Sequence, residues 1–430
     1  IKNEIKNIDK NIRNNKERKL EGMTLAVKDN ILVTGLSATA GSKMLKDYKA
    51  SYEATVIKKI KEAGGVVVGK TNMDEFAMGS SNETSYFGVV KNPHNLSKVP
   101  GGSSGGSVAA VASGMVDVAL GSDTAGSIRQ PASFCGVVGF KPTYGAVSRF
   151  GLIAMSSSLD VIGPIAKNVS DCEMIFDIIA GKDDYDATSV EVVSENKEWT
   201  LDDVKNLTIG VPKEYFVTGI DQEVKDNINK FISKLKELGI KIKEISLPHT
   251  EYAIACYYII MPAEVSSNLA RYDNVRYGSK IDDLNIQNLK DLYFKTRGDG
   301  FGREVKRRIL LGTYVLSKGF YDQYYTKAQK VRRLIKQDFD KAFKEVDLIL
   351  TPTCPDVAFN FGAKKQDPIS MYLSDIFTVP MNLAGIPAIS LPLAKNKDGL
   401  PIGLQLTMPE KFDKKLLKIS KIIELLINYN

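Results

Sequence analysis

Short β-branched runs alternate with amphipathic helical segments along this chain, and the alternation constrains its fold more than any other feature. Apolar residues recur at helical spacing over residues 51–63, and the run Val66-Val67-Val68 follows them. The same order returns in the second half, with a helical pattern over residues 224–238 and a strand-like alternation over 240–247. We therefore predict an α/β protein with a large mixed central β-sheet that is covered by helices on both faces.

The remaining elements follow the same periodicities. We expect a helix over residues 107–113, a strand over 116–120, long helices over 303–317 and 321–346, strands over 347–351, 387–393 and 402–407, and a closing helix from Phe412.

The chain has 430 residues, of which 43% are hydrophobic, so it can bury one large core or two smaller ones. The polar segment 181–206 fits a linker between domains as well as an exposed excursion from one domain. We predict a single domain over residues 1–430, with 181–206 as the excursion. Residues 1–20 lack the continuous apolar stretch of a secretory signal, as an already processed or truncated chain also would, and we expect them to form a helical lead-in.

Hydrophobic patterning predicts no membrane span, because the most apolar stretch, residues 107–121, is interrupted by Asp117 and several small residues. We expect a bacterial cytoplasmic protein, and an organellar location remains open.

The net charge of +7 fits a lysine-rich solvated surface better than a nucleic-acid interface. The four cysteines form no CxxC pair, which disfavours a zinc site and a disulfide framework.

Histidine is scarce, and this restricts the chemistry that the chain can perform. The two histidines are His94, within a Pro-His-Asn turn, and His249, which follows a proline at the end of a strand. Both are typical of ordinary loop residues, so a Ser-His-Asp hydrolase and a multi-histidine metal site are disfavoured. A nucleophilic serine would need another base, and a buried lysine can provide one because burial disfavours its charged form.

Two short patterns suggest other chemistry but lie in the wrong context. Residues 64–71 match the phosphate-binding pattern GxxxxGK[ST], yet a helix precedes the pattern and three stiff valines occupy its interior. Residues 233–236 match SxxK but fall on an amphipathic surface helix. A nucleotide-binding module built on residues 64–71 therefore ranks last among the functions considered.

Two loops rich in glycine and hydroxyl side chains are better candidates for a site. The first spans residues 101–107 and the second spans 121–131, one helix and one strand further along the chain. Successive N–H groups in such a tight turn can point at one spot, as an oxyanion hole requires. Each loop alone is equally compatible with a purely structural role.

Together with Val27-Lys28-Asp29-Asn30, these loops resemble the amidase signature family in order and spacing. The resemblance implies that Lys28 is the base, Ser103 the bridging residue and Ser127 the nucleophile. It also places an oxyanion hole at Thr124, Ala125 and Gly126. The family usually has two glycines before the nucleophile, whereas this chain has Ala125 and Gly126. A positive φ at residue 125 would strain the alanine, but we expect its methyl group to be tolerated.

The chain is also similar to one branch of that family, the A subunits of glutamyl-tRNA(Gln) amidotransferase. The similar segments are residues 141–145, 148–152, 266–273 and 301–309. The branch implies a glutaminase that supplies ammonia to a B subunit, where tRNA-bound glutamate is amidated with ATP and Mg²⁺ while a small C subunit clasps the two. It implies no cofactor in this chain, and tRNA contacts mainly through the B subunit.

Free glutamine carries a carboxylate and an ammonium group, so its site should offer a cation and an anion. The match to the branch nominates Arg307 and Asp375, with Tyr258 beside them. The main alternative function is a stand-alone amidase that hydrolyses another small or peptide amide.

Overall fold

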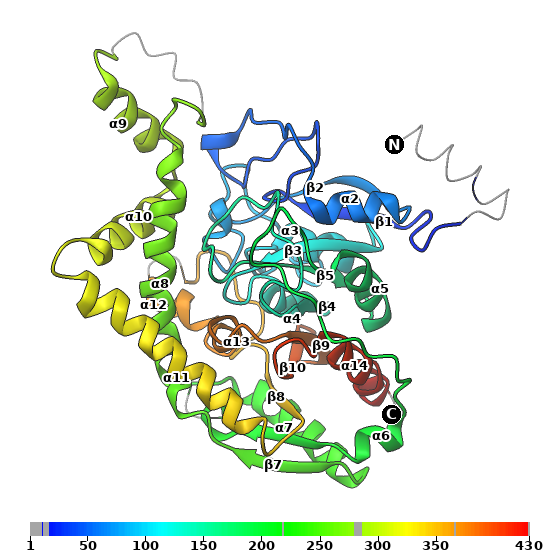
Figure 1. Cartoon of the computed structure of the whole chain (residues 1–430). Coiled ribbons are helices and arrows are strands. Elements are labelled where there is room, and N and C mark those ends of the chain that lie inside the picture. The colour runs from blue at the N-terminus through cyan, green and yellow to red at the C-terminus, as the bar shows by residue number, and fades with distance from the viewer. Residues whose placement is uncertain (1–10, 12–16, 217–218, 279–285, 365–366, 429–430) are drawn as a thin grey trace.

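A computed structural model describes residues 11, 17–216, 219–278, 286–364 and 367–428 (Figure 1). It contains one ten-stranded sheet in the order β2-β1-β3-β5-β4-β9-β10-β8-β6-β7. The strands are β1 Thr24–Lys28, β2 Val66–Thr71, β3 Val118–Asp123, β4 Val138–Lys141, β5 Val161–Ala166, β6 Thr208–Pro212, β7 Lys241–Ile245, β8 Leu348–Pro352, β9 Ala388–Lys395 and β10 Pro401–Thr407.

The sheet is mixed, as predicted. Its two ends are parallel, because β1 pairs in parallel with β2 and β3, and β6 with β7 and β8. In the middle of the sheet the strands lie in the order β3, β5, β4, β9, β10 and β8, and each neighbouring pair is antiparallel. Polar turns and helices connect these strands, as the alternating pattern of the sequence requires.

The two-residue repeat of the strands sends alternate side chains into different cores. Leu25 and Val27 of β1 enter a core that also contains Phe176, whereas Ala26 between them enters a second core with Val108. Helices therefore cover both faces, and the predicted fold class is confirmed. The main helices are α2 Thr55–Glu62, α3 Gly105–Ala112, α4 Arg129–Cys135, α5 Val169–Ile179, α7 Gln222–Glu237, α8 Ala253–Asn268, α9 Leu289–Gly300, α10 Arg303–Leu316, α11 Lys327–Ala342 and α14 Asp413–Asn428, with the shorter α6 Leu201–Lys205, α12 Pro368–Leu373 and α13 Val379–Ala384.

Figure 1 shows α8, α10 and α11 running along one side of the sheet, where α8 packs against both of the others. The helix predicted over residues 321–346 divides in two, because a π-helical turn, Tyr321–Thr326, precedes α11. The closing helix α14 packs against α5 and β9, beside the middle of the sheet.

The polar segment after residue 180 contains no helix or strand until α6. It is nevertheless attached to the body, since Asp186 accepts a hydrogen bond from the Arg149 backbone and Val193 N–H donates to Lys411. The helical lead-in expected over residues 1–20 lies mostly outside the described residues. No helix among the described residues combines the length and the hydropathy needed to cross a membrane.

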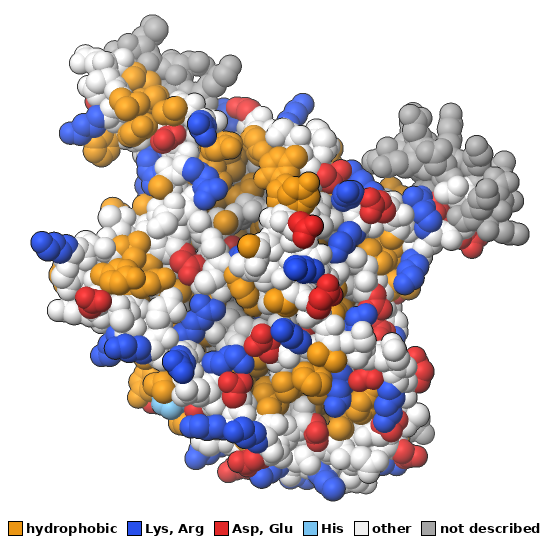
Figure 2. Space-filling model, in the orientation of Figure 1, with side chains coloured by type: hydrophobic (Ala, Val, Ile, Leu, Met, Phe, Trp, Pro, Cys, Tyr) orange, Lys and Arg blue, Asp and Glu red, His pale blue; other side chains and the backbone are white. Residues whose placement is uncertain are grey.

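The charged side chains on the face drawn in Figure 2 are of both signs. Lysine and arginine side chains are spread over this face, and aspartate and glutamate side chains lie among them. This mixture agrees with the expected lysine-rich solvated surface.

Candidate active site

The catalytic candidates meet at the carboxyl ends of two neighbouring parallel strands. Lys28 is the last residue of β1, and the turn 124–127 follows β3, which pairs with β1. The Gly-Ser loop 101–104 leads into α3, which packs over both strands. Side chains that follow adjacent parallel strands lie at one edge of a sheet, so segments almost a hundred residues apart are brought together here.

Lys28 is fully buried and makes three polar contacts through Nζ. They are with Ser103 Oγ at 2.7 Å, Ser122 Oγ at 2.9 Å and the carbonyl oxygen of Ser122 at 3.1 Å. The carbonyl can only accept, while each hydroxyl can donate or accept. A neutral amine, with two N–H groups and one lone pair, satisfies this geometry by accepting the Ser103 proton.

The surroundings of Lys28 favour that neutral form. Burial lowers the pKa of Lys28 to about 7, although the carboxylates of Asp74, Asp123 and Asp160 act in the opposite direction. A substantial fraction of the amine is therefore unprotonated at neutral pH, as a general base requires.

The two candidate serines lie on loops that are joined through their backbones. Ser104 N–H donates to the carbonyl oxygen of Ser127 at 3.0 Å, and the peptide between Gly102 and Ser103 is cis. Ser103 is completely buried, whereas Ser127 keeps 7% of its surface exposed. Among the described residues, the Ser127 hydroxyl has no hydrogen-bond partner, so the structure links Ser103 to Lys28 directly and to Ser127 only through the loops.

The turn at residues 124–127 presents unused backbone donors. Within the described part of the chain, the N–H groups of these four residues donate to no protein acceptor. Asp123 and Arg129 hold the turn in shape: the Asp123 carboxylate accepts from Ile128 N–H at 3.1 Å and pairs with the fully buried Arg129 guanidinium at 3.1 Å. Burial opposes ionisation of Asp123, but Arg129 outweighs it and lowers the pKa of that carboxyl to about 2.

Within this turn it is Gly126, not Ala125, that needs the special backbone conformation. Gly126 has φ of 144°, and a Cβ there would lie 2.2 Å from the Thr378 hydroxyl. Ala125 is absent from the described residues with positive φ, and its carbonyl accepts a hydrogen bond from Thr378 at 2.5 Å. This agrees with the expectation that the alanine methyl group is tolerated.

On the substrate side, the arginine nearest to Tyr258 is Arg308. The Arg308 side chain is 5% exposed, lies 5.4 Å from the Tyr258 ring centre and contacts Glu304 at 2.9 Å. Arg307 is 37% exposed and pairs with the other oxygen of Glu304 at 2.6 Å. Both arginines line a cavity of about 240 Å³ together with Ser80 and the ring of Tyr372.

Asp375 is buried behind Ser80, whose hydroxyl donates to one of its carboxylate oxygens. The other oxygen, Oδ1, has no partner among the described residues. Burial raises the pKa of Asp375 to about 7, with the nearby Asp123 adding to the effect. An unpartnered buried carboxylate oxygen is suited to accept hydrogen bonds from an ammonium group.

The comparisons with known proteins agree with this geometry. A family profile described as Amidase matches residues 2–417. The chain belongs to the amidase family. The A subunit of glutamyl-tRNA(Gln) amidotransferase of Halothermothrix orenii is 54% identical over 414 residues, which cover 96% of this chain and 86% of that protein.

Solved amidases share the fold. A crystal structure of the glutamyl-tRNA(Gln) amidotransferase A subunit from Thermotoga maritima has 47% identity and a TM-score of 0.81, covering 95% of this chain and 84% of that one. Native peptide amidase from Stenotrophomonas maltophilia has 27% identity and a TM-score of 0.80, covering 100% and 87%. The amidase signature resemblance and its amidotransferase branch are thus confirmed.

Other candidate groups of this amidase have ordinary structural roles. His94 contacts the Cys135 carbonyl at 2.9 Å, and His249 contacts Asp338 at 2.9 Å. Residues 66–71 form strand β2 instead of a phosphate-binding loop, and Lys70 pairs with Asp29 at 3.1 Å. All four cysteines are buried and free. The part of the chain that the structure describes holds no group of three potential metal ligands.

Sequence reasoning missed several supporting residues of the amidase site. Ser122 contacts Lys28, although its position in the sequence indicates only a turn, and Asp160 accepts a hydrogen bond from the Thr124 hydroxyl at 2.7 Å. Arg308 could have been found from spacing, because Val305, Arg308 and Gly312 form the buried stripe of α10. The hydrogen bond from Ser80 to Asp375 spans 295 residues and carries no local sequence pattern.

Proposed function

We propose that this chain is a glutaminase that works as the A subunit of a glutamyl-tRNA(Gln) amidotransferase. The observation that carries the proposal is 54% identity to such a protein over 96% of the chain. The contact of 2.7 Å between the buried amine of Lys28 and the Ser103 hydroxyl supports it, because a serine amidase without histidine needs this base.

In the proposed mechanism, Lys28 Nζ takes the proton of Ser103 while Ser103 takes the proton of Ser127. Ser127 Oγ then attacks the side-chain carbonyl carbon of glutamine. The free N–H groups of residues 124–127 stabilise the oxyanion that forms. The proton is returned to the leaving nitrogen, which departs as ammonia. Water then hydrolyses the remaining ester between Ser127 and the glutamyl group and releases glutamate.

The substrate's charged groups have candidate partners on either side of the Ser80 segment. Asp375 Oδ1 is free to hold the ammonium group, and Arg308 is the buried cation suited to the α-carboxylate, with Arg307 at the rim of the same cavity. The Tyr258 ring stacks on Tyr372 at 3.7 Å between centres and forms an aromatic wall beside Arg308.

The proposal includes two partner proteins. Ammonia passes to a B subunit that binds ATP, Mg²⁺ and most of the tRNA, and a C subunit joins the two chains. Bacterial cytoplasm is the proposed location. The second candidate is a stand-alone amidase, favoured by the full-length structural likeness to peptide amidase at 27% identity.

One assay separates the two candidates. Glutamine, asparagine and simple primary amides are hydrolysed by the purified chain with and without B and C subunits, and ammonia release is measured. The glutaminase proposal expects a preference for glutamine and stimulation by the partners. Efficient hydrolysis of peptide amides, with glutamine poor and the partners without effect, would favour the stand-alone amidase.

A further inference from the structure

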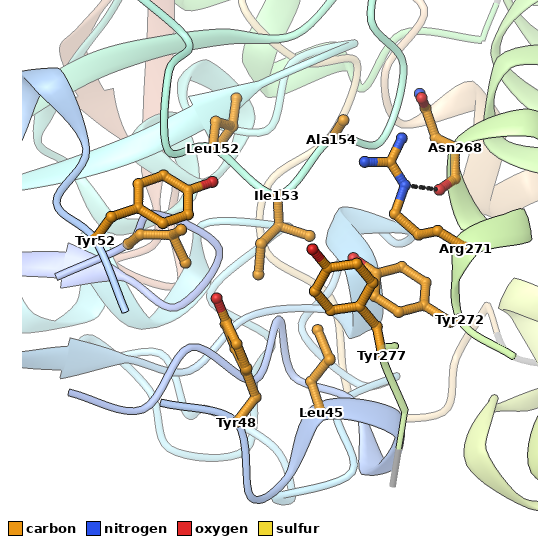
Figure 3. A pocket seen from close by; sticks show the side chains of 11 residues that line it. Leu45, Tyr48, Tyr52, Leu152, Ile153, Ala154, Asn268, Arg271, Tyr272 and Tyr277 are labelled. Atoms are coloured by element: carbon orange, nitrogen blue, oxygen red, sulfur yellow. Dashed lines mark hydrogen bonds between the residues drawn. The ribbon is translucent and has the colours of Figure 1, made fainter. Parts of the chain in front are cut away.

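A second cavity, of about 140 Å³, lies apart from the residues of the candidate active site. It is formed between the segment around Tyr48 and Tyr52, the turn at Ile153 and the loop that follows α8 (Figure 3). The loop closes on itself through a bridge between Tyr272 and Tyr277, which places both rings at the cavity wall.

Hydrogen-bond donors converge on this cavity. Figure 3 shows the hydroxyl groups of Tyr48, Tyr52 and Tyr277 turned toward its middle, with the Arg271 guanidinium at the rim. The groups are close enough to influence one another: burial raises the pKa of Tyr52, Tyr48 and Tyr277 raise it further, and Arg271 lowers it.

Most of these donors are unused within the described part of the chain. The three tyrosine hydroxyls make no hydrogen bond there, and Arg271 forms no ion pair. Arg271 Nε alone is engaged, donating to the Asn268 carbonyl at 2.8 Å, so both terminal nitrogens of the guanidinium remain available. None of the described residues that line the cavity is an Asp or Glu, so its chemistry favours an anion.

Size and wall chemistry restrict the ligand further. A cavity of about 150 Å³ in another protein accepts one benzene ring, so 140 Å³ is suited to a single ring-sized body. Aromatic rings form much of the wall, and they favour flat ligands. A guanidinium with two free terminal nitrogens matches the geometry of a carboxylate.

We propose that this cavity is a binding site for a small carboxylate carried on a flat, ring-sized body. Arg271 holds the carboxylate through its terminal nitrogens, and the hydroxyls of Tyr48, Tyr52 and Tyr277 donate to its oxygens. The site takes its ligand independently of the amide chemistry at Ser127.

The cavity wall is linked to the catalytic lysine by a short chain of hydrogen bonds. Ile153 N–H donates to the Asn30 carbonyl at 2.8 Å, Asn30 Nδ2 donates to Ser122 Oγ at 2.9 Å, and Ser122 Oγ contacts Lys28 at 2.9 Å. Activity could therefore respond to substitutions in the wall for indirect reasons, so binding is the quantity to measure.

Titration calorimetry on the whole chain tests the site with benzoate as the probe. Benzyl alcohol serves as the neutral ligand of similar shape, and inorganic phosphate as an oxyanion without a ring. Benzoate is expected to bind at least about tenfold more tightly than either, because the charge-assisted contacts and the ring are both needed. Arg308→Gln, which removes the buried cation of the active-site cavity, should bind benzoate as the unmodified chain does, which separates this site from the active site.

Two substitutions in the cavity and one outside it complete the test. Arg271→Gln should weaken benzoate binding about tenfold, and Tyr52→Phe, which removes one hydroxyl from a half-exposed ring, about threefold. Arg333→Gln, which changes an exposed arginine on α11, should leave binding unchanged. The proposal would be overturned if benzoate did not bind at up to about 10 mM, or if both cavity variants bound it as tightly as the unmodified chain does. Tighter binding of phosphate than of benzoate would also overturn it.

Discussion

Lys28 has the environment of a lysine that works without its proton. It is fully buried, and burial lowers its pKa to about 7, although the nearby carboxylates of Asp74, Asp123 and Asp160 raise it. Because only the neutral amine can accept a proton, kcat/KM for amide hydrolysis should fall as pH drops below about 7 and level off above it. A pH–rate profile measures this, and a rate that rises on acidification would contradict the assignment of Lys28 as base.

Substitutions of Lys28 test the same role without changing pH. Lys28→Arg keeps the positive charge but cannot lose its proton near neutrality, and Lys28→Met removes the base altogether. Both should lower kcat by about 10²–10⁴-fold, the usual contribution of a general base. Lys61→Arg, at a surface lysine that pairs with Glu53, is a matched control and should keep full activity. Retained activity in Lys28→Arg would show that the charge, not proton transfer, matters.

Two adjacent arginines should differ sharply in their effect on substrate binding. Arg308→Gln removes the buried cation and should raise KM for glutamine about tenfold or more, because hydrogen bonds to charged groups are the stronger ones. Arg307→Gln removes a half-exposed partner of Glu304 and should change KM less than about threefold. Hydrolysis of a simple amide without a carboxylate should be nearly equal in both variants. Equal KM effects on glutamine would contradict the distinction.

This pair also shows where sequence reasoning about single residues stops. The resemblance nominates Arg307, and this nomination stays a prediction; the helical repeat places its neighbour Arg308 on the buried stripe of α10, with Val305 and Gly312. Lys28, Ser103 and Ser127 were nominated by the register of three segments. Ser80 and Asp160 were not found, because their roles depend on contacts between distant segments that no local pattern encodes.

At the scale of elements, the turn between β3 and α4 depends on one glycine. Gly126→Ala would force φ of 144° on an alanine and place its Cβ against Thr378. We expect a loss of about 1–3 kcal/mol in the free energy of unfolding and a marked fall in kcat, since the proposed oxyanion donors lie on this turn. Thermal unfolding and initial rates measure the two effects.

The control for that substitution is Gly298→Ala in α9. A Cβ there meets no atom within 4 Å, and alanine favours helices over glycine by about 1 kcal/mol. This variant should unfold at the same or a slightly higher temperature, with unchanged kcat. A similar loss of activity in both variants would mean that the turn geometry is not the cause.

Most elements could be predicted because their periodicities are regular. The helices after residues 302 and 412 begin within a residue or two of the predicted positions, and β8 to β10 lie where alternation or apolar runs placed them. The π-helical turn Tyr321–Thr326 could not be predicted, because its side-chain pattern is close to that of the α-helix that follows. The segment 181–199 has no periodicity, and its attachment to Arg149 and Lys411 depends on tertiary contacts.

For the whole molecule, composition and alternation predicted the α/β class, while strand order could not be obtained from them. The order places β1 beside β3, and this adjacency brings Lys28 to the serine loops. The family resemblance groups Lys28, Ser103 and Ser127, and the strand order explains why their segments meet. The second cavity carried no sequence pattern, because its walls come from three separate segments.

Assembly with partner subunits tests the function of the whole molecule. The chain co-expressed with B and C subunits should co-purify with them and convert Glu-tRNA(Gln) to Gln-tRNA(Gln) with glutamine as nitrogen donor. Ser127→Ala should still co-purify, because the substitution removes one hydroxyl from a nearly buried residue. It should support amidation only with added ammonium salt. Failure of the unmodified chain to associate would favour a stand-alone amidase.

Covalent trapping identifies the nucleophile of the chain directly. A reactive glutamine analogue, such as a γ-electrophilic derivative, is incubated with the whole chain, and the modified residue is located by peptide mass spectrometry. We predict one adduct on Ser127 Oγ, with no adduct in Ser127→Ala, whose rate of glutamine hydrolysis should fall at least about 10⁴-fold. An adduct on another residue, or substantial hydrolysis by Ser127→Ala, would contradict this prediction.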